Sequence, residues 1–254
     1  MNAQTAELGF ADIAGVGELL ADASRARVLM ALLDGRALPA SVLAAEAGVS
    51  ASTASAHLSR LVAGGLLTVR PSGRHRYYRL AGPEVATVLE AVAALAPIRP
   101  VRSLRESTRA AAMRNARSCY DHLAGKLGVA VTAALLERNA LTRNDGGVDT
   151  ERAPEDPLAA PLHEHPYELG PAAEPIFTEL GVDLDQLRSR RRPLLRFCVD
   201  WSEQQHHLGG ALGAAVLIRM ESADWLERHN SRRALRVTPA GTRALDRILG
   251  VGVE

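Results

Sequence analysis

The chain has 254 residues, of which 47% are hydrophobic and only 4% aromatic, so it can form one large or two ordinary domains with mostly aliphatic cores. Its formal net charge of +1 identifies no class of partner by itself, and its two widely separated cysteines do not form a disulfide framework. Because no apolar run is long enough to span a bilayer and no signal-peptide pattern opens the chain, we expect a cytoplasmic protein with no membrane partner.

Two helices are predicted ahead of the most informative stretch. Ala11–Leu20 begins the first, which is a candidate for dimer contacts. Ser24–Leu33 forms the second, because its apolar residues recur at helical spacing. Asp22 or Ser24 is a suitable cap for this second helix, since a short side-chain oxygen can accept a hydrogen bond from the first helical turn.

The next stretch predicts a helix, a tight turn and a second helix. Leu43–Ala47 has the pattern of the end of a short helix, Gly48 breaks that pattern, and Ser50 is a good N-cap for a helix over Ala51–Ala63. One face of the second helix is apolar, and the other carries short hydrogen-bonding side chains that can approach base edges. We expect the following residues to enter the major groove of DNA: Ser52, Thr53, Ser55, His57 and Arg60.

A basic β-hairpin is predicted after this helix. Leu66–Arg70 and Arg74–Leu80 have the pattern of strands around a turn at Pro71-Ser72-Gly73. Between Ser50 and Leu80 there are five arginines and no Asp or Glu, so positive charge is concentrated on a segment that can face phosphate. The hairpin residues expected to hold the DNA backbone or minor groove are Arg70, Arg74, His75 and Arg76.

Three motifs in this region point to a known family. They are LADASRARVLMALL (Leu20–Leu33), STASAHLSRLVAGGLL (Ser52–Leu67) and VRPSGRHRYYRL (Val69–Leu80). Over roughly residues 10–96 the chain resembles the ArsR family of bacterial transcriptional regulators, with the three motifs in the family's order and at its spacing. The resemblance implies a winged helix-turn-helix fold and binding to a double-stranded DNA operator.

Pro83–Leu95 predicts an amphipathic helix. In the ArsR family this helix packs against its symmetry mate, so the resemblance implies a homodimer that matches a palindromic operator. The Pro97-Ile98-Arg99-Pro100 stretch breaks the helical pattern. We therefore expect residues 1–97 to form a DNA-binding and dimerisation domain and residues 98–254 to form a sensor domain.

The familiar metal sites of the family do not match this sequence. Many relatives carry Cys-Val-Cys where this chain has Leu38–Leu43, which contains no thiol. Others use Asp and His on the dimerisation helix, where this chain offers only Glu84 and Glu90. Metal sensing at either of these places is not expected.

The second half of the chain contains an internal repeat. The pattern His-Leu-small-Gly-x-Leu-Gly occurs at His122–Gly128 and at His207–Gly213, and a second pair of similar segments is Tyr167–Phe177 and Leu235–Leu245. We infer two copies, at about residues 117–184 and 196–254, each a degenerate winged-helix-like unit, which enclose a groove between them. The predicted fold class is therefore mainly α with small β-hairpins (α+β).

Each copy contains a cysteine followed by a histidine. Cys119 and His122 are three residues apart and are expected on one helix face, and Cys198 similarly precedes His207 in the second copy. Thiolate and imidazole bind soft or borderline metals, and paired thiols react with oxidants or arsenite. Together with Trp201 these residues are candidates for contacting an effector, either a metal ion or a small organic molecule. A plain core role for the cysteines is the alternative.

The sequence therefore predicts a ligand-responsive dimeric repressor of the ArsR type, with no certain cofactor. A thiol-dependent enzyme is an alternative, but the chain lacks a nucleophile-elbow motif, and an enzyme would leave the basic hairpin unexplained. An architectural DNA-binding protein without an effector is a third alternative. DNA binding alone needs only about the first 100 residues, which argues against it.

Overall fold

A computed structural model of the chain describes residues 11–73, 75–97, 111–157, 161–162, 164–189, 191–228 and 233–252. They form two compact units. The N-terminal unit consists of the described residues of Met1–Ala31 and Ala37–Ala81, and the C-terminal unit of those of Leu32–Arg36 and Gly82–Glu254. None of the described helices combines the length and the apolar character that crossing a membrane requires.

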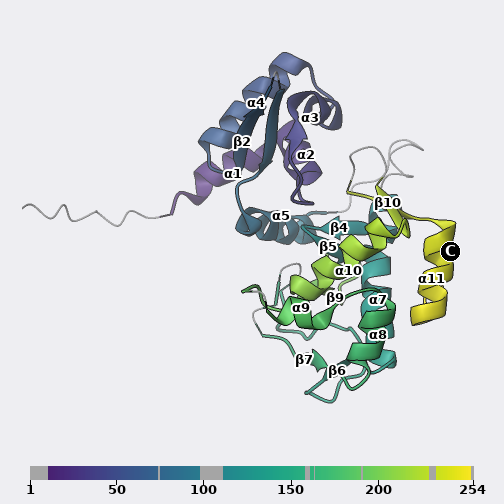
Figure 1. Cartoon of the computed structure of the whole chain (residues 1–254). Helices are drawn as coiled ribbons and strands as arrows, with labels where there is room; N and C mark the ends of the chain where they lie inside the picture. Colours follow the sequence, from purple (N-terminus) through teal and green to yellow (C-terminus); the bar gives the residue numbers. More distant parts are fainter. Residues whose placement is uncertain are drawn as a thin grey trace, which may run out of the picture. The chain divides into compact units, whose positions relative to one another are not determined.

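The N-terminal unit is a winged helix-turn-helix (Figure 1). Its sheet has the strand order β1-β3-β2, with both pairs antiparallel. Four helices accompany the sheet, and their apolar faces supply the buried core. In chain order the elements are α1 (Ile13–Ala21), α2 (Ala23–Ala31), β1 (Leu38–Pro39), α3 (Ala40–Ala47), α4 (Ala51–Ala63), β2 (Leu67–Ser72) and β3 (His75–Leu80).

The tight turn between α3 and α4 confirms the prediction made from its residues. Gly48 ends α3 with φ +69°, a left-handed conformation that favours glycine. Ser50 then caps α4, since its Oγ accepts a hydrogen bond from the Thr53 N–H at 3.2 Å. Leu58 and Leu61 on the inner face of α4 are fully buried, which leaves the polar face toward solvent.

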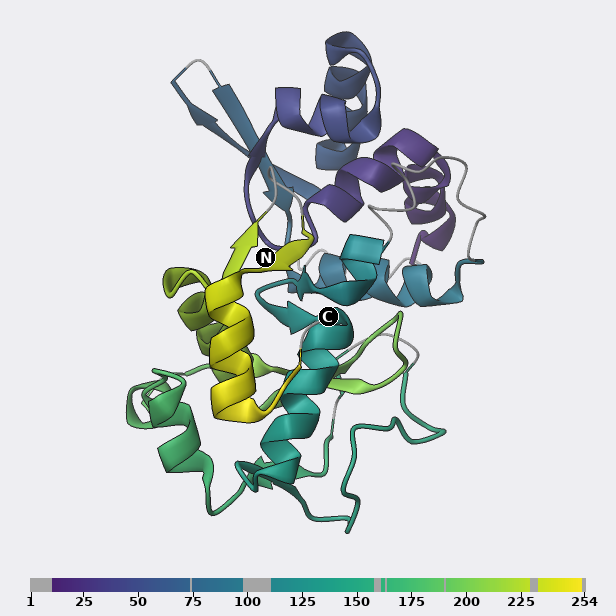
Figure 2. The same ribbon diagram turned by 90° about the vertical axis from the view of Figure 1, so that its right-hand side faces the viewer.

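The first strand of the hairpin, β2, ends two residues later than the sequence pattern predicts. Its register runs from Leu67 opposite Leu80 to Ser72 opposite His75, and Figure 2 shows it as a two-stranded arm. Pro71, expected in the turn, instead lies within β2. Because β2 is an edge strand, a residue without an N–H is tolerated there.

Helix α5 (Pro83–Leu95) has the predicted bounds. Its Leu89 and Glu90 are buried, whereas Val88, Val92 and Leu95 are 48%, 45% and 73% exposed. The division into compact units groups α5 with the second half of the chain, although the sequence assigns it to the DNA-binding domain. The domain boundary at residue 97 stays a prediction.

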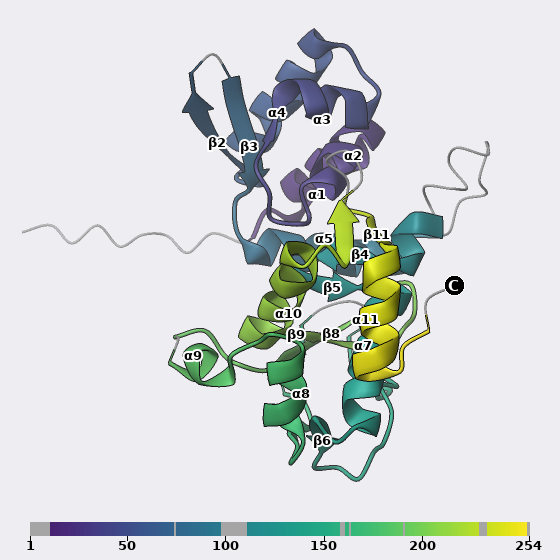
Figure 3. The ribbon, with the colours of Figure 1, turned by 45° about the vertical axis from the view of Figure 1, so that its right-hand side comes forward.

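Two successive runs of hairpin, helix, hairpin and helix follow α5 (Figure 3). The first is β4 (Arg117–Cys119), β5 (His122–Ala124), α7 (Gly125–Glu137), β6 (Leu141–Arg143), β7 (Tyr167–Leu169) and α8 (Ala173–Glu179). After α9 (Leu184–Arg188), the second is β8 (Arg196–Val199), β9 (His206–Gly209), α10 (Gly210–Ser222), β10 (Leu226–Arg228), β11 (Leu235–Val237) and α11 (Pro239–Leu249). This order agrees with the inferred duplication, and the winged-helix-like character of each copy stays a prediction.

His122 and His207 lie on strands, which corrects the expectation that Cys119 and His122 share a helix face. His122 belongs to β5, and α7 begins only at Gly125. Gly125 and Gly210 have φ +76° and +73°, and a Cβ on Gly210 would lie 2.7 Å from the Leu194 carbonyl oxygen. These glycines let the chain turn from strand into helix. Cys119 and His122 consequently face each other across a hairpin.

The two copies share one hydrophobic core. Helix α10 packs on β5 of the first copy, and α7 packs on β9 of the second. The fully buried Thr132 of α7 accepts a hydrogen bond from the Leu208 N–H of β9 at 2.9 Å. Phe177 and Phe197, one from each copy, are both fully buried in the same cluster. Because the helix of each copy packs on the hairpin of the other copy, the two hairpins are held in fixed positions relative to each other.

Candidate DNA-contacting surface and effector site

The outer face of α4 carries most of the side chains that the sequence assigns to DNA. Ser52, Thr53, Ser55 and Arg60 are exposed. The Ser50 Oγ lies 2.9 Å from both Ser52 Oγ and Thr53 Oγ1, so the hydroxyls at the start of the helix form a local network. Their short side chains suit close approach to base edges, and their contact with bases stays a prediction.

His57 differs from these residues. Its side chain is only 15% exposed, and its Nε2 lies 3.7 Å from Oδ1 of Asp22. Asp22 is itself held in place, because it accepts hydrogen bonds from the backbone N–H groups of Ser24 and Arg25, both at 2.9 Å. Asp22 therefore caps α2 as predicted, and His57 must leave this carboxylate before it can contact a base.

The hairpin of β2 and β3 presents basic side chains to solvent. Arg70, His75 and Arg76 are exposed. No acidic partner of Arg70 or Arg76 is present among the described residues. Arg74, which the sequence also assigns to the DNA backbone, lies outside the described residues. Arginines on such a hairpin are suited to phosphate contacts that position a protein on DNA.

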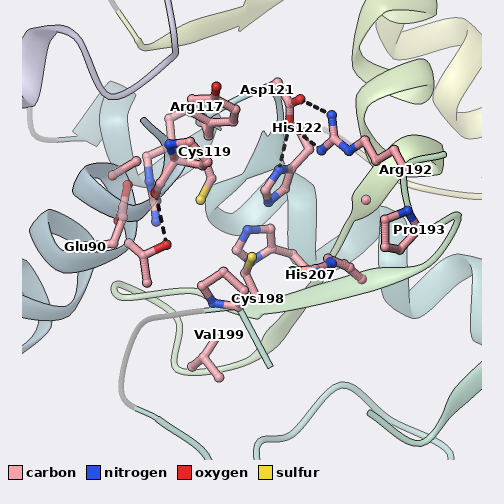
Figure 4. A pocket seen from close by; sticks show the side chains of 17 residues that line it. Glu90, Arg117, Cys119, Asp121, His122, Arg192, Pro193, Cys198, Val199 and His207 are labelled. Carbon is pink, nitrogen blue, oxygen red and sulfur yellow. Dashed lines mark hydrogen bonds and ion pairs between the residues drawn. The ribbon is translucent and has the colours of Figure 1, made fainter. Parts of the chain in front are cut away.

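The two cysteines and two repeated histidines meet in the C-terminal unit. Cys119 pairs with His122 in the register of β4 and β5, and Cys198 pairs with His207 in the register of β8 and β9. The two hairpins therefore contribute equivalent cross-strand pairs. One ligand atom from each of the four residues lies within 4.8 Å of all the others, and Figure 4 shows the four side chains turned toward one another.

Three of the four imidazole nitrogens in this cluster lack a hydrogen-bond partner among the described residues. His122 and His207 are buried, and their rings stack with centroids 5.1 Å apart. His122 Nε2 and both ring nitrogens of His207 have no hydrogen-bond partner in the described part of the chain. Buried polar atoms are almost always hydrogen-bonded. Such unpaired nitrogens indicate a site that a ligand completes.

Packing these groups together away from water changes their pKa values. Burial, followed by the neighbouring His122, lowers the pKa of His207 to about 3. A hydrogen bond to Cys198, together with burial, raises the pKa of the Cys119 thiol well above its usual value. A cation bound here must therefore displace the proton of Cys119, since the thiolate is the form that binds metals.

An aspartate stands beside each histidine. Asp121 Oδ1 lies 3.4 Å from His122 Nδ1, and Asp200 Oδ2 lies 3.9 Å from His207 Nδ1. In both copies the aspartate comes two residues after the cysteine. Carboxylates in this position orient metal-binding imidazoles in known sites.

Each aspartate is held by an arginine from the other half of the C-terminal unit. Arg117 of β4 donates to Asp200 at 2.8 Å, and Arg192, which precedes β8, donates to Asp121 at 3.0 Å. Neither arginine was predicted from the sequence. The repeated pattern Arg-x-Cys-x-Asp, present as RSCYD at Arg117 and as RFCVD at Arg196, is the signal that points to Arg117. No comparable signal marks Arg192.

A cavity of about 400 Å³ adjoins the cluster. Its walls come from α5 and from both copies. They are formed by Pro83, Ala86, Thr87, Glu90, Arg117, Cys119, Tyr120, Asp121, His122, Pro161, Arg192, Pro193, Arg196, Cys198, Val199, His207 and Gly210. Trp201, a predicted effector contact, does not belong to this lining. Its ring lies against the Arg117 guanidinium, whose Cζ is 4.6 Å from the ring centroid, and Arg117 itself belongs to the cavity lining.

A buried arginine connects this cluster to α5. Arg233 donates to Glu90 Oε1 at 2.6 Å and to the Ser118 carbonyl oxygen at 2.8 Å. Ser118 immediately precedes Cys119 on β4. Glu90 is only 6% exposed and Arg233 only 3%, so the interaction is shielded from water and salt. Displacement of β4 therefore changes the surroundings of a charged residue on α5.

The neighbouring His206 belongs to a separate network. Its Nδ1 lies 2.7 Å from the Tyr167 hydroxyl, and its Nε2 lies 2.9 Å from Asp156 Oδ2. Both nitrogens are thus occupied by protein groups. Of the adjacent histidines 206 and 207, only His207 has ring nitrogens without partners.

Several known DNA-binding proteins are similar to the N-terminal part of the chain. A helix-turn-helix domain family matches residues 20–70. The solved winged helix-turn-helix domain of Mb0332 from Mycobacterium bovis is 33% identical and covers 34% of this chain and 87% of that chain, with a TM-score of 0.30. The regulator CmtR of Mycobacterium tuberculosis is 41% identical over 85 residues, which are 34% of this chain and 71% of the relative.

A longer match extends over both units. An uncharacterized HTH-type transcriptional regulator of Bacillus subtilis, YdfF, is 40% identical over 242 residues, which are 95% of this chain and 99% of the relative. The similarity therefore includes the hairpins that carry Cys119, His122, Cys198 and His207. The chain belongs to this family of HTH-type transcriptional regulators.

Proposed function

We propose that the protein is a dimeric repressor whose affinity for its operator depends on an effector bound in the C-terminal unit. One observation carries this proposal: the cavity of about 400 Å³ is walled partly by α5, and only Ala81 and Gly82 separate α5 from the end of β3. An effector that moves α5 thus acts on an element joined directly to the basic hairpin.

For operator contact we propose that α4 reads bases and the hairpin holds phosphates. The exposed hydroxyls of Ser52, Thr53 and Ser55 support the first role, since they are short enough to reach base edges. The exposed Arg70 and Arg76 support the second.

For the dimer we propose contact between copies through α5. Val88, Val92 and Leu95 repeat at helical spacing on its exposed side. An apolar face of this kind is best covered by a second copy, which also doubles the contacts to a palindromic site. The energetic demand on the effector is modest, because a tenfold loss of operator affinity needs only about 1.4 kcal/mol of differential binding.

The test begins with selection of an operator from random duplex DNA by the full-length protein. We expect one enriched palindrome, bound by two chains in analytical ultracentrifugation. Failure to enrich any sequence contradicts operator recognition, and binding of a single chain to a half-site contradicts the dimer.

The effector part is tested by filling the cavity. Thr87→Trp narrows it from the α5 side, and we expect operator affinity to change at least tenfold, because a filled cavity favours one position of α5. The matched control is Thr178→Trp on the exposed side of α8, which is expected to bind DNA as the wild type does. Equal DNA affinity of both variants and the wild type contradicts control through this cavity.

A further inference from the structure

We propose that the two cross-strand pairs, Cys119 with His122 and Cys198 with His207, bind a single thiophilic divalent metal ion of the zinc and cadmium class through two thiolates and two imidazoles, and that this ion is the effector. The binding part stands on the geometry of the C-terminal unit alone. The effector part rests on the function proposed above.

The spacing of the donor atoms fits one ion. With Zn–S bonds of about 2.3 Å and Zn–N bonds of about 2.0–2.1 Å, the donor atoms of a tetrahedral site lie roughly 3.3–3.8 Å apart. The four donor atoms here already lie within 4.8 Å of one another. A contraction of about 1 Å, easily made by side-chain rotation, therefore closes the site around an ion.

The orientation of the histidines also fits. Asp121 lies beside His122 Nδ1, and Asp200 lies beside His207 Nδ1. The Asp121 carboxylate, 3.4 Å from His122 Nδ1, favours binding of an ion through Nε2 of that ring, whereas Asp200 at 3.9 Å makes no hydrogen bond to His207 Nδ1. Nε2 of both rings is buried and has no hydrogen-bond partner in the described residues. An aspartate lies near the histidine in both copies, but only Asp121 is close enough to form a hydrogen bond with its imidazole.

The donor types select the class of ion. Two sulfur and two nitrogen donors favour zinc-like or softer ions, whereas magnesium and calcium require mostly oxygen donors. The two carboxylates nearest the cluster, Asp121 and Asp200, are bound to Arg192 and Arg117. They are therefore held as supports of the imidazoles and are not free to become ligands.

Closure of the site reaches α5 through β4. An ion draws Cys119 toward Cys198, and the Ser118 carbonyl beside Cys119 accepts the hydrogen bond from Arg233. Arg233 also binds Glu90 of α5. The contraction that completes the coordination shell therefore shifts Arg233, which is the partner of the buried Glu90 carboxylate on α5. Because α5 follows the basic hairpin in the chain, this shift is a route from the ion to the hairpin.

The experiment uses the full-length protein, reduced and stripped of metal by a chelator under anaerobic conditions. Titration with Co²⁺ should give the visible d–d bands of a tetrahedral ion and a sulfur-to-cobalt charge-transfer band. Both should saturate at one ion per chain, and Zn²⁺ should then abolish them. A weak octahedral spectrum, or no charge-transfer band while both thiols titrate as reduced, overturns the binding part.

Variants locate the ion. His207→Gln should lose tight Co²⁺ binding, whereas the matched variant His206→Gln should keep it, because the nitrogens of His206 are occupied by Tyr167 and Asp156. Equal loss in both variants that retain wild-type circular dichroism contradicts the assignment. A measurement on the wild type needs no variant: Zn²⁺ or Cd²⁺ should protect Cys119 and Cys198 together from alkylation. Unprotected cysteines in the metal-loaded protein contradict the proposal.

The effector part has its own readout. Operator affinity of the stripped protein should fall at least tenfold when one equivalent of Zn²⁺ or Cd²⁺ is added. If the ion binds with the expected spectrum and operator affinity does not change, the metal site stands and its role as effector is wrong. Operator affinity could instead fall with an oxidant that forms a disulfide between Cys119 and Cys198 and stay unchanged with metal. In that case the effector part is wrong, and oxidation of the two thiols is the signal.

Discussion

At the scale of single residues, two arginine–aspartate pairs support the candidate metal site in different surroundings. The side chains of Arg117 and Asp200 are 1% and 0% exposed, and Asp200 also accepts the Gly125 N–H at 2.7 Å. Burial alone would raise the pKa of Asp200, yet the charge of Arg117 and the hydrogen bonds from Arg117 and the Gly125 N–H hold it well below its usual value. This carboxylate is therefore charged inside the unit and depends on its partner.

The buried pair leads to a stability prediction. Arg117→Met should lower the free energy of unfolding by about 3–5 kcal/mol, because it leaves the Asp200 carboxylate buried without its counter-charge. The control is Arg192→Met, which breaks the equivalent but partly exposed pair with Asp121 and should cost about 0–1 kcal/mol. Urea unfolding monitored by circular dichroism measures the free energy of unfolding of both variants. Equal decreases in the two variants would contradict the difference between the buried pair and the partly exposed pair.

The aspartates also lead to a prediction about affinity. Asp121→Asn keeps all four metal ligands but weakens the acceptor beside His122 Nδ1. Loss of such a support typically costs about 10–100-fold in metal affinity. We expect an unchanged Co²⁺ spectrum with a dissociation constant higher by that factor. Asp185→Asn on the exposed surface of α9 is the control, and a variant Asp121→Asn that binds Co²⁺ as tightly as the wild type would falsify the supporting role.

At the scale of elements, the helices were the most predictable part of the fold. The Ser50 cap and the break at Gly48 set α4, and the bounds Pro83–Leu95 hold for α5, because local capping and apolar spacing are written directly in the sequence. The donor residues were found from the internal repeat. Their arrangement in space depends on contacts between segments that are distant in the sequence. The spacing of residues along the chain does not reveal those contacts.

The error at Cys119 and His122 has a local cause. A spacing of three residues is typical of a helix face, but it also fits a cross-strand pair closed by a two-residue turn. Here the turn is Tyr120-Asp121, with Tyr120 at φ +54°. Neither residue is the glycine or asparagine that usually marks such a turn, so the sequence carried no turn signal.

The basic hairpin gives a prediction at the same scale. Arg76→Ala should weaken binding to all duplexes by similar factors and reduce the slope of log affinity against log salt by about 0.9, the value for one lost phosphate contact. Arg243→Ala removes an exposed arginine of α11 and should leave the slope unchanged. Fluorescence anisotropy at several salt concentrations measures both variants, and an unchanged slope for Arg76→Ala removes this residue from the contact surface.

At the scale of the whole molecule, control of DNA binding requires two sites joined by an element with more than one position. The duplicated hairpins build a site at their junction, where neither copy has a full ligand set alone. Helix α5 lines the adjoining cavity and continues from the basic hairpin through Ala81 and Gly82. The duplication thus creates a site between the two copies that has the size of one ion. The direct chain connection between α5 and the basic hairpin links this site to DNA binding.

Substitution of Glu90 distinguishes binding of the ion from the effect of the ion on operator affinity. Glu90→Gln should keep the wild-type Co²⁺ spectrum and affinity, because Glu90 is not among the four ligands. It replaces the charged acceptor of Arg233 by a neutral one and weakens that interaction. The change in operator affinity caused by Zn²⁺ should therefore shrink severalfold. Glu84→Gln on the exposed first turn of α5 should respond to Zn²⁺ like the wild type, whereas a full response in Glu90→Gln would exclude this route.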